Sequence, residues 1–149
     1  MGWPMRVATT VALCAALLCG CSTAGRYVVS DIDGGTWESP VTLEIPNSDT
    51  TGLYDIRIAL RHNGLPVGTT VAMNIRTVTP DSLWTDEQLT LTVRDDGRSR
   101  SSQHEAGCTY RRRVRFGSEG RYRMIVTPQR VLRGVTAVGV EMTPEGENE

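Results

Sequence analysis

The sequence contains no lysine, and all 16 of its basic residues are arginines. We interpret this bias as a coding bias of the gene rather than as a sign of function, although arginine also favours bidentate contacts with anions. The 17 acidic residues bring the formal net charge to −1. A protein with this balance has no excess positive charge to attract a polyanion, so nucleic acid is excluded as an expected partner.

Long apolar segments are also lacking. The longest one covers residues 7–19 and is shorter than the roughly 20 residues that a membrane-spanning helix needs. It follows a single positive charge at Arg6, and this order is typical of a secretory signal peptide. Beyond this region the sequence has two cysteines, Cys21 and Cys108. Once Cys21 carries lipid, Cys108 is the only thiol left. An intramolecular disulfide is therefore excluded, and the exported domain must rely on its core.

The residues Leu18-Cys19-Gly20-Cys21 end the apolar segment. They are similar to the lipobox of bacterial lipoproteins, with leucine at −3, a small residue at −1 and the lipidated cysteine at +1. Cys14 and Cys19 each follow a leucine, which is too bulky for the −1 position. We therefore expect cleavage before Cys21. Cys21 should then carry covalent diacylglycerol and an N-acyl lipid such as palmitate, and we expect no other cofactor. Two or more acyl chains hold a protein stably on a membrane. An ordinary signal peptide and a soluble secreted domain are the alternative.

The predicted organisation has four parts: a signal peptide at 1–20, the lipidated Cys21 and a tether at 21–26, one β-domain at 27–143, and a disordered acidic tail at 144–149. A domain of this length is of ordinary size for a single core. Ser22 follows the lipidated cysteine, which by analogy with enteric bacteria favours the outer membrane. No acidic run follows, so we expect the periplasmic side.

Apolar and polar residues alternate throughout the predicted domain, which is the pattern of half-buried strands. No segment of ten or more residues shows a helical period. Short alternating segments separated by turn signals predict an all-β fold, an antiparallel β-sandwich or jelly-roll-like single domain. Residues 98–107 are polar and small, and we expect them to form a mobile loop. The inner faces of the expected strands comprise Val41, Leu43, Ile45, Tyr54, Ile56, Ile58, Leu60, Val71, Met73, Ile75, Leu89, Leu91, Val93, Tyr122, Met124, Val126, Val138, Val140 and Met142.

One predicted hairpin concentrates positive charge. If residues 118–120 form a three-residue loop with Gly120 in the left-handed region, the flanking segments pair with each other. Phe116 and Tyr122 then face inward. Like charges opposite each other destabilise a sheet, so we expect compensation by acidic neighbours or by solvent. A docking patch for an anionic partner, such as lipid phosphate or an acidic protein surface, is the functional alternative. The outward residues are Arg111, Arg113, Arg115, Arg121 and Arg123.

Catalytic and metal-binding motifs are lacking as well. His62 lies next to an Asn-Gly turn and His104 in the polar loop, so both are expected to be exposed, and neither has a metal-ligand spacing. We predict no catalytic residue and no metal. Asp95-Asp96-Gly97 is better interpreted as a turn than as a calcium loop. Cys108 is expected to be a buried small residue. Trp37 and Trp84 are candidates for core-edge packing or, alternatively, for sugar-stacking platforms.

The chain resembles the gliding motility lipoprotein family GldH. The resemblance rests on the lipobox, on YVVSDIDGGTW at 27–37, on YDIRIALR at 54–61, on the Gly120-x-Tyr122 strand start and on the segment 132–140. It implies a non-enzymatic envelope lipoprotein that is needed for gliding motility and linked to type IX secretion. It further implies partners among other envelope lipoproteins or motility and secretion proteins. The alternative from the residues themselves is a β-sandwich lipoprotein that binds glycan.

Overall fold

The computed structural model describes residues 25–97 and 102–146. The predicted signal peptide and the lipidation site at Cys21 lie outside the described residues, as do positions 147–149 of the predicted tail. In the part that is described, no helix is long and apolar enough to cross a membrane.

The described residues form ten strands and one short 3-10 helix. Strands such as β3, β5 and β8 alternate between buried and more exposed side chains along much of their length, as half-buried strands must. In chain order the elements are β1 (Arg26–Asp31), η1 (Asp33–Gly35), β2 (Thr36–Trp37), β3 (Val41–Asn47), β4 (Tyr54–His62), β5 (Thr70–Val78), β6 (Trp84–Thr92), β7 (His104–Val114), β8 (Gly120–Pro128), β9 (Leu132–Arg133) and β10 (Val135–Pro144).

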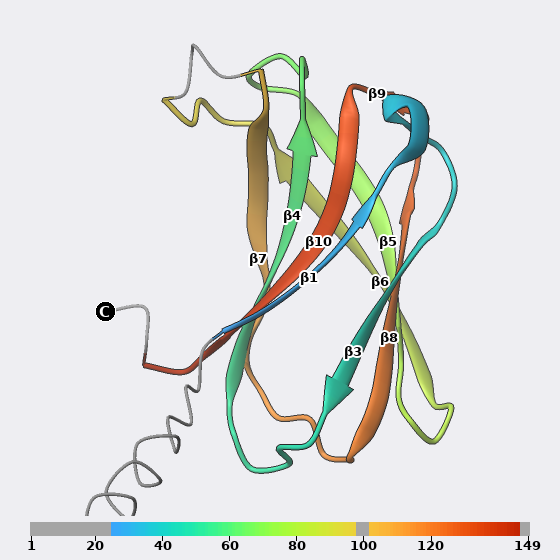
Figure 1. Cartoon of the computed structure of the whole chain (residues 1–149), viewed down its shortest axis with the longest axis vertical. Helices are drawn as coiled ribbons and strands as arrows, with labels where there is room; N and C mark the ends of the chain where they lie inside the picture. Colours follow the sequence, from blue (N-terminus) through green and yellow to red (C-terminus); the bar gives the residue numbers. More distant parts are fainter. Residues whose placement is uncertain (1–24, 98–101, 147–149) are drawn as a thin grey trace, which may run out of the picture.

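Two four-stranded antiparallel sheets face each other (Figure 1). The first has the order β1-β10-β4-β7 and the second has the order β3-β8-β5-β6. A small third ladder joins β2 to β9. The pairs β1 with β10, β3 with β8, β4 with β7 and β5 with β6 are nested within one another along the chain. This nesting is the jelly-roll arrangement, and it confirms the predicted all-β, sandwich-like single domain.

The core lies between the two sheets. Every predicted inner-face residue is buried except Tyr54 and Leu89, which are partly buried against the core. Leu89 lies on β6, which is an edge strand, so one flank of its side chain has no neighbouring strand. The alternation in the sequence therefore identified the buried faces correctly.

The predicted pairing of β7 with β8 is wrong. β7 pairs with β4 in the first sheet, and β8 lies between β3 and β5 in the second. Residues 115–119 cross from one sheet to the other instead of forming a hairpin loop. Alternation determines which side chains face inward but not which strand is the neighbour. Gly120 does have a positive φ of 124°, in the left-handed region that was predicted for it.

The boundaries of the domain also differ from the prediction. Arg26, which was assigned to the tether, is the first residue of β1 and pairs with Met142. The second half of the predicted loop at 98–107 belongs to β7, which begins at His104 and pairs with β4. Pro144, which was assigned to a disordered tail, ends β10, and the backbone N–H of Glu145 donates to the carbonyl of Leu53 at 2.9 Å. Strand pairing orders these polar residues despite their composition.

Candidate functional site

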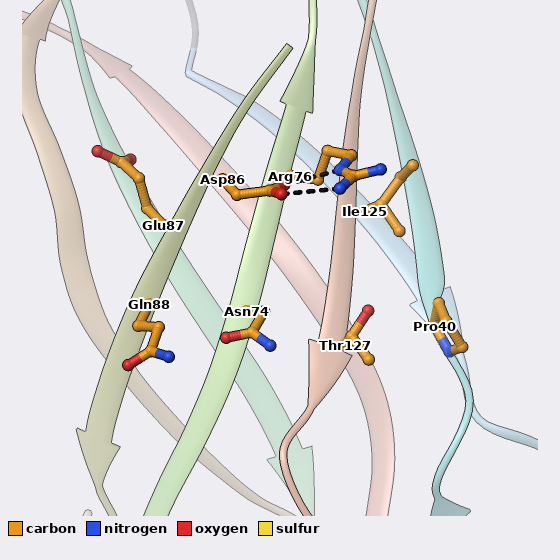
Figure 2. A pocket seen from close by; sticks show the side chains of 8 residues that line it. All are labelled: Pro40, Asn74, Arg76, Asp86, Glu87, Gln88, Ile125 and Thr127. Atoms are coloured by element: carbon orange, nitrogen blue, oxygen red, sulfur yellow. Dashed lines mark hydrogen bonds and ion pairs between the residues drawn. The ribbon is translucent and has the colours of Figure 1, made fainter.

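The outer face of the second sheet carries aligned rows of polar side chains (Figure 2). The registers of β8, β5 and β6 place Asn74 between Thr127 and Gln88, and Arg76 between Ile125 and Asp86. Side chains that alternate along a strand and sit opposite one another across strands share one surface. The sheet thus holds amide, hydroxyl, carboxylate and guanidinium groups side by side.

Arg76 organises the centre of this surface. Its guanidinium donates two hydrogen bonds to the carboxylate of Asp86, each 2.7 Å long. The same guanidinium lies 4.4 Å from the ring centroid of Trp84, within the range of a cation–π contact. The hydrogen bonds from Arg76 hold the pKa of Asp86 below its ordinary value. Asp86 therefore stays ionised at neutral pH, and the Arg76 side chain keeps the indole of Trp84 in place.

A groove of about 590 Å³ runs across these rows. Pro40 borders it on the side of β3, and Gln129 donates a 3.2 Å hydrogen bond to the amide oxygen of Asn74 near one end. Small-molecule sites are concave and combine apolar surface with a few fixed polar groups. This groove is richer in polar groups than most such sites. Its donors and acceptors match a polyhydroxylated ligand in chemistry.

The two tryptophans that the structure describes, Trp37 and Trp84, have different roles. Trp37 is 1% exposed, and its Nε1–H donates to the carbonyl of Ser39 at 3.0 Å. The β2–β9 ladder places it opposite Leu132 in the core, so packing is confirmed for Trp37 and a surface platform is not. Trp84 is 59% exposed at the start of β6. Only Trp84 is therefore placed to contact a ligand at the surface.

The five arginines of the predicted docking patch do not form one outer face. Arg111 and Arg113 lie on β7 in the first sheet, while Arg121 and Arg123 lie on β8 in the second. Arg115 lies in the segment that connects the sheets. The patch required β7 and β8 to be neighbours, and their separation divides it.

Acidic neighbours compensate most of this charge, as one of the two interpretations expected. Arg113 pairs with Glu145 at 2.9 Å, and Arg121 pairs with Glu44 on β3 at 3.0 Å. Arg111 pairs with Glu87 on β6. Within residues 25–97 and 102–146, Arg115 and Arg123 form no ion pair within 4.0 Å. Of the predicted patch, only Arg115 and Arg123 are thus left without an ion pair in the described part of the chain, and they lie on different segments.

The expectation that His62 is exposed is wrong. His62 is the last residue of β4 and is 3% exposed, because it continues the inward-facing row of Ile58 and Leu60 along that strand. The two imidazole rings stack with centroids 5.6 Å apart. Within the described ranges, neither ring nitrogen of His62 has a hydrogen-bond partner. Burial, with a smaller effect of His104, lowers the pKa of His62, so this imidazole is neutral at pH 7.

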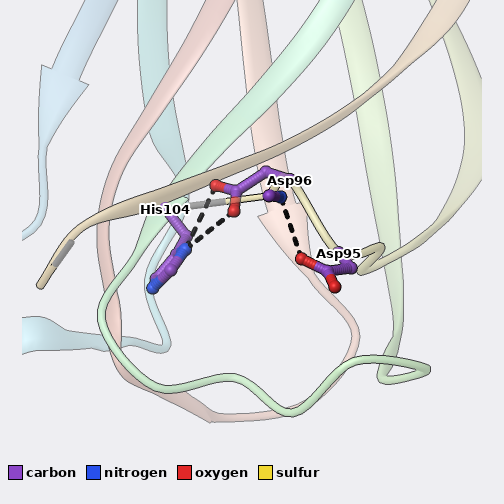
Figure 3. A network of polar contacts seen from close by, with 4 residues as sticks. Asp95, Asp96 and His104 are labelled. Atoms are coloured by element: carbon purple, nitrogen blue, oxygen red, sulfur yellow. Dashed lines mark hydrogen bonds and ion pairs between the residues drawn. The ribbon is translucent and has the colours of Figure 1, made fainter. Parts of the chain in front are cut away.

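His104 is half-buried and contacts Asp96 (Figure 3). Its Nδ1 lies 3.0 Å and 3.1 Å from the two carboxylate oxygens of Asp96. The backbone N–H of Gly97 donates to the side chain of Asp95 at 2.9 Å, a hydrogen bond that is typical of a turn begun by aspartate. Among the residues described, no group of three or more His, Cys, Asp or Glu side chains could hold a metal ion.

Cys108 lies on β7 opposite Ile58 and is half-buried. Burial raises the pKa of its thiol. The thiolate is the nucleophilic form of cysteine, so this side chain is in its unreactive form at neutral pH. The position is less buried than the sequence suggested, since β7 is an edge strand.

The fold and the groove define the protein as an antiparallel β-sandwich of jelly-roll topology with a polar groove on one outer face. No protein-family model matches the chain, and no curated protein matches it significantly. The resemblance to the GldH family therefore stays a prediction.

Proposed function

We propose that the protein is a non-enzymatic lipoprotein of the bacterial envelope, anchored by lipid on Cys21 and acting through binding. The lipobox Leu18-Cys19-Gly20-Cys21 is the observation that carries this proposal. The folded domain begins at Arg26, five positions after the cysteine (26 − 21). A fully extended chain spans about 3.4 Å per residue, so the anchor would hold this end of the sandwich within about 17 Å of the membrane.

Replacing the cysteine tests the anchor directly. We expect Cys21→Ala to move the protein from the detergent phase to the aqueous phase in a phase-partition assay, because the lipidated thiol is gone. Cys108→Ala is the matched control and should leave the protein in the detergent phase, since Cys108 lies within the sandwich. A Cys21→Ala variant that stays with detergent would contradict the proposal.

The resemblance to GldH supports a more specific proposal. The protein would be an accessory subunit of the gliding motility or type IX secretion machinery, in the outer membrane and facing the periplasm. Crosslinking in cells should then recover other envelope lipoproteins or motility and secretion proteins, and it should do so from wild type more than from Cys21→Ala. Recovery of no envelope protein in either case would count against this role.

Glycan binding is the second candidate function, and the exposed indole of Trp84 beside the polar groove favours it. Aromatic rings give large contact area at low entropic cost. Asn74, Gln88 and Thr127 would supply hydrogen bonds to hydroxyl groups. Asp86 and Arg76 already satisfy each other and would bind as a fixed pair.

For this candidate we expect a glycan array to give a hit that Trp84→Ala weakens at least about tenfold, which corresponds to about 1.4 kcal/mol of binding free energy. Leu83→Ala is the matched control, because Leu83 is adjacent in sequence and similarly exposed, whereas it is the ring of Trp84 that lies against Arg76 of the groove. An empty array, together with a protein partner found by crosslinking, would favour the accessory-subunit role.

A further inference from the structure

A second cavity lies between the two sheets, away from the outer groove. Its volume is about 320 Å³. Its deep wall comes from inward-facing residues of β3, β4 and β8, namely Ile45, Ile56 and Met124, each of which is at most 4% exposed. Phe116 and Tyr122 complete this wall with an edge-to-face contact whose ring centroids are 5.0 Å apart. The interior is therefore almost entirely apolar.

The cavity exists because the sandwich is open between β6 and β7. These strands are the outer members of different sheets and do not pair with each other. Thr85 points inward on β6 but is exposed, since no strand covers it. On β7 the register with β4 shifts twice near its end, and Arg113 takes a positive φ of 56°. Bulges of this kind bend a strand, and the end of β7 leaves the space unfilled.

The mouth of the cavity is positively charged. Its exposed lining residues include Arg111 and Arg115. Arg111 is paired with Glu87, to which the hydroxyl of Tyr110 also donates. Arg115 forms no ion pair within 4.0 Å in the described part of the chain. An apolar interior thus opens beside one guanidinium that is free to bind an anion.

We propose that this cavity binds an amphiphile with one acyl chain and an anionic head group, the chain between the sheets and the head group on Arg115. Ligand cavities commonly measure about 300–1,000 Å³, so a volume of about 320 Å³ suits a single chain and excludes the bulk of a two-chain lipid. Guanidinium binds carboxylate and phosphate groups in a bidentate manner. The inference is independent of the lipid anchor and of the outer groove.

Photolabelling tests the site. The purified full chain is irradiated with a decanoate analogue that carries a diazirine at the end of its chain, and the labelled peptides are identified by mass spectrometry. We expect label on the cavity wall, at Ile56 or Met124, and loss of label when unmodified decanoate competes. Each further buried methylene should strengthen competition about fourfold, so decanoate should compete about sixteenfold better than octanoate.

Two variants separate the cavity from the surface. Val114→Trp fills the cavity and should reduce labelling at least tenfold. In wild type, the anionic decanoate should compete with the label better than the neutral decanol does. Arg115→Gln changes an exposed side chain and should remove this preference. Arg112→Gln is the control, because Arg112 is exposed on β7, three positions before Arg115, and does not line the cavity. Decyl phosphate, competed in parallel, distinguishes a phosphate from a carboxylate head group. Label spread over the surface, or labelling and head-group preference unchanged in both variants, would overturn the proposal.

Discussion

Trp37→Ala should lower the free energy of unfolding by about 3–5 kcal/mol, the usual cost of removing a large buried aromatic side chain. Trp37 is 1% exposed and belongs to the central cluster of buried residues. It also closes one end of the sandwich, because its strand β2 pairs with β9 and not with either large sheet. The substitution would leave a cavity where neighbouring backbone segments can only partly collapse. Denaturant unfolding followed by circular dichroism measures this loss.

Trp84→Ala is the matched control, since it removes the same side chain from a 59% exposed position. Its cost should be about 1 kcal/mol or less, the value of an exposed cation–π contact with Arg76. A Trp84→Ala variant that is as destabilised as Trp37→Ala would contradict the assignment of one tryptophan to the core and the other to the surface.

The stability of the protein should fall as the pH drops below about 6.5, and His62 should be a main cause. Burial lowers the pKa of His62 in the folded state, whereas the unfolded chain should have the ordinary value of about 6.5. Between these two pKa values the unfolded state binds a proton that the folded state does not. The stabilisation is therefore complete above pH 6.5 and decreases towards the folded pKa, with a slope of up to about 1.4 kcal/mol per pH unit.

His62→Leu isolates this effect. Leucine places an apolar side chain in the buried site and removes two ring nitrogens that have no hydrogen-bond partner among the described residues. We expect the free energy of unfolding of His62→Leu to be nearly flat between pH 7 and pH 5, where the wild type loses stability. His104→Gln is the control and should keep most of the slope, because burial affects the pKa of His62 more than His104 does. Identical pH profiles for wild type and His62→Leu would show that His62 does not titrate in this range.

The fold class and the buried faces could be predicted from the sequence because they depend on local periodicity. Residues such as Leu43 and Ile75 lie between polar neighbours in the sequence, and the structure leaves them 1% and 0% exposed. Pairing depends instead on contacts between distant segments. Nothing local to residues 108–126 indicates that β7 joins β4 and that β8 joins β3. The predicted arginine face required β7 and β8 to be neighbours, and because they lie in different sheets its arginines are separated.

The same limit applies to the candidate sites. His62 is an exception: it looked exposed because Asn63 and Gly64 follow it, yet it continues the alternation of Ile58 and Leu60 that marks the buried face. The outer groove could not be foreseen, because Asn74, Gln88 and Thr127 come from three strands that align only in the folded sheet. Trp84 was a visible signal in the sequence. Its exposure could not be told from that of Trp37, since each lies at the start or end of a short strand.

The groove and the inner cavity lie on opposite sides of the second sheet and involve different side chains. Residues that alternate along one strand explain this division, since Arg76 faces the groove while Thr77 faces the cavity. Substitutions in one site should therefore leave the other intact, except at Glu87, which lines the groove and pairs with Arg111 of the cavity. This independence allows the glycan and amphiphile experiments to be interpreted separately.

The central claim, that lipid on Cys21 anchors a folded β-domain to a membrane, is tested most directly by the intact mass of the protein extracted from membranes of the native host. The account predicts a chain that begins at Cys21 and carries the added mass of a diacylglycerol and an N-linked acyl group. A chain cut at another position, or one that begins at Cys21 with no added mass, would contradict it.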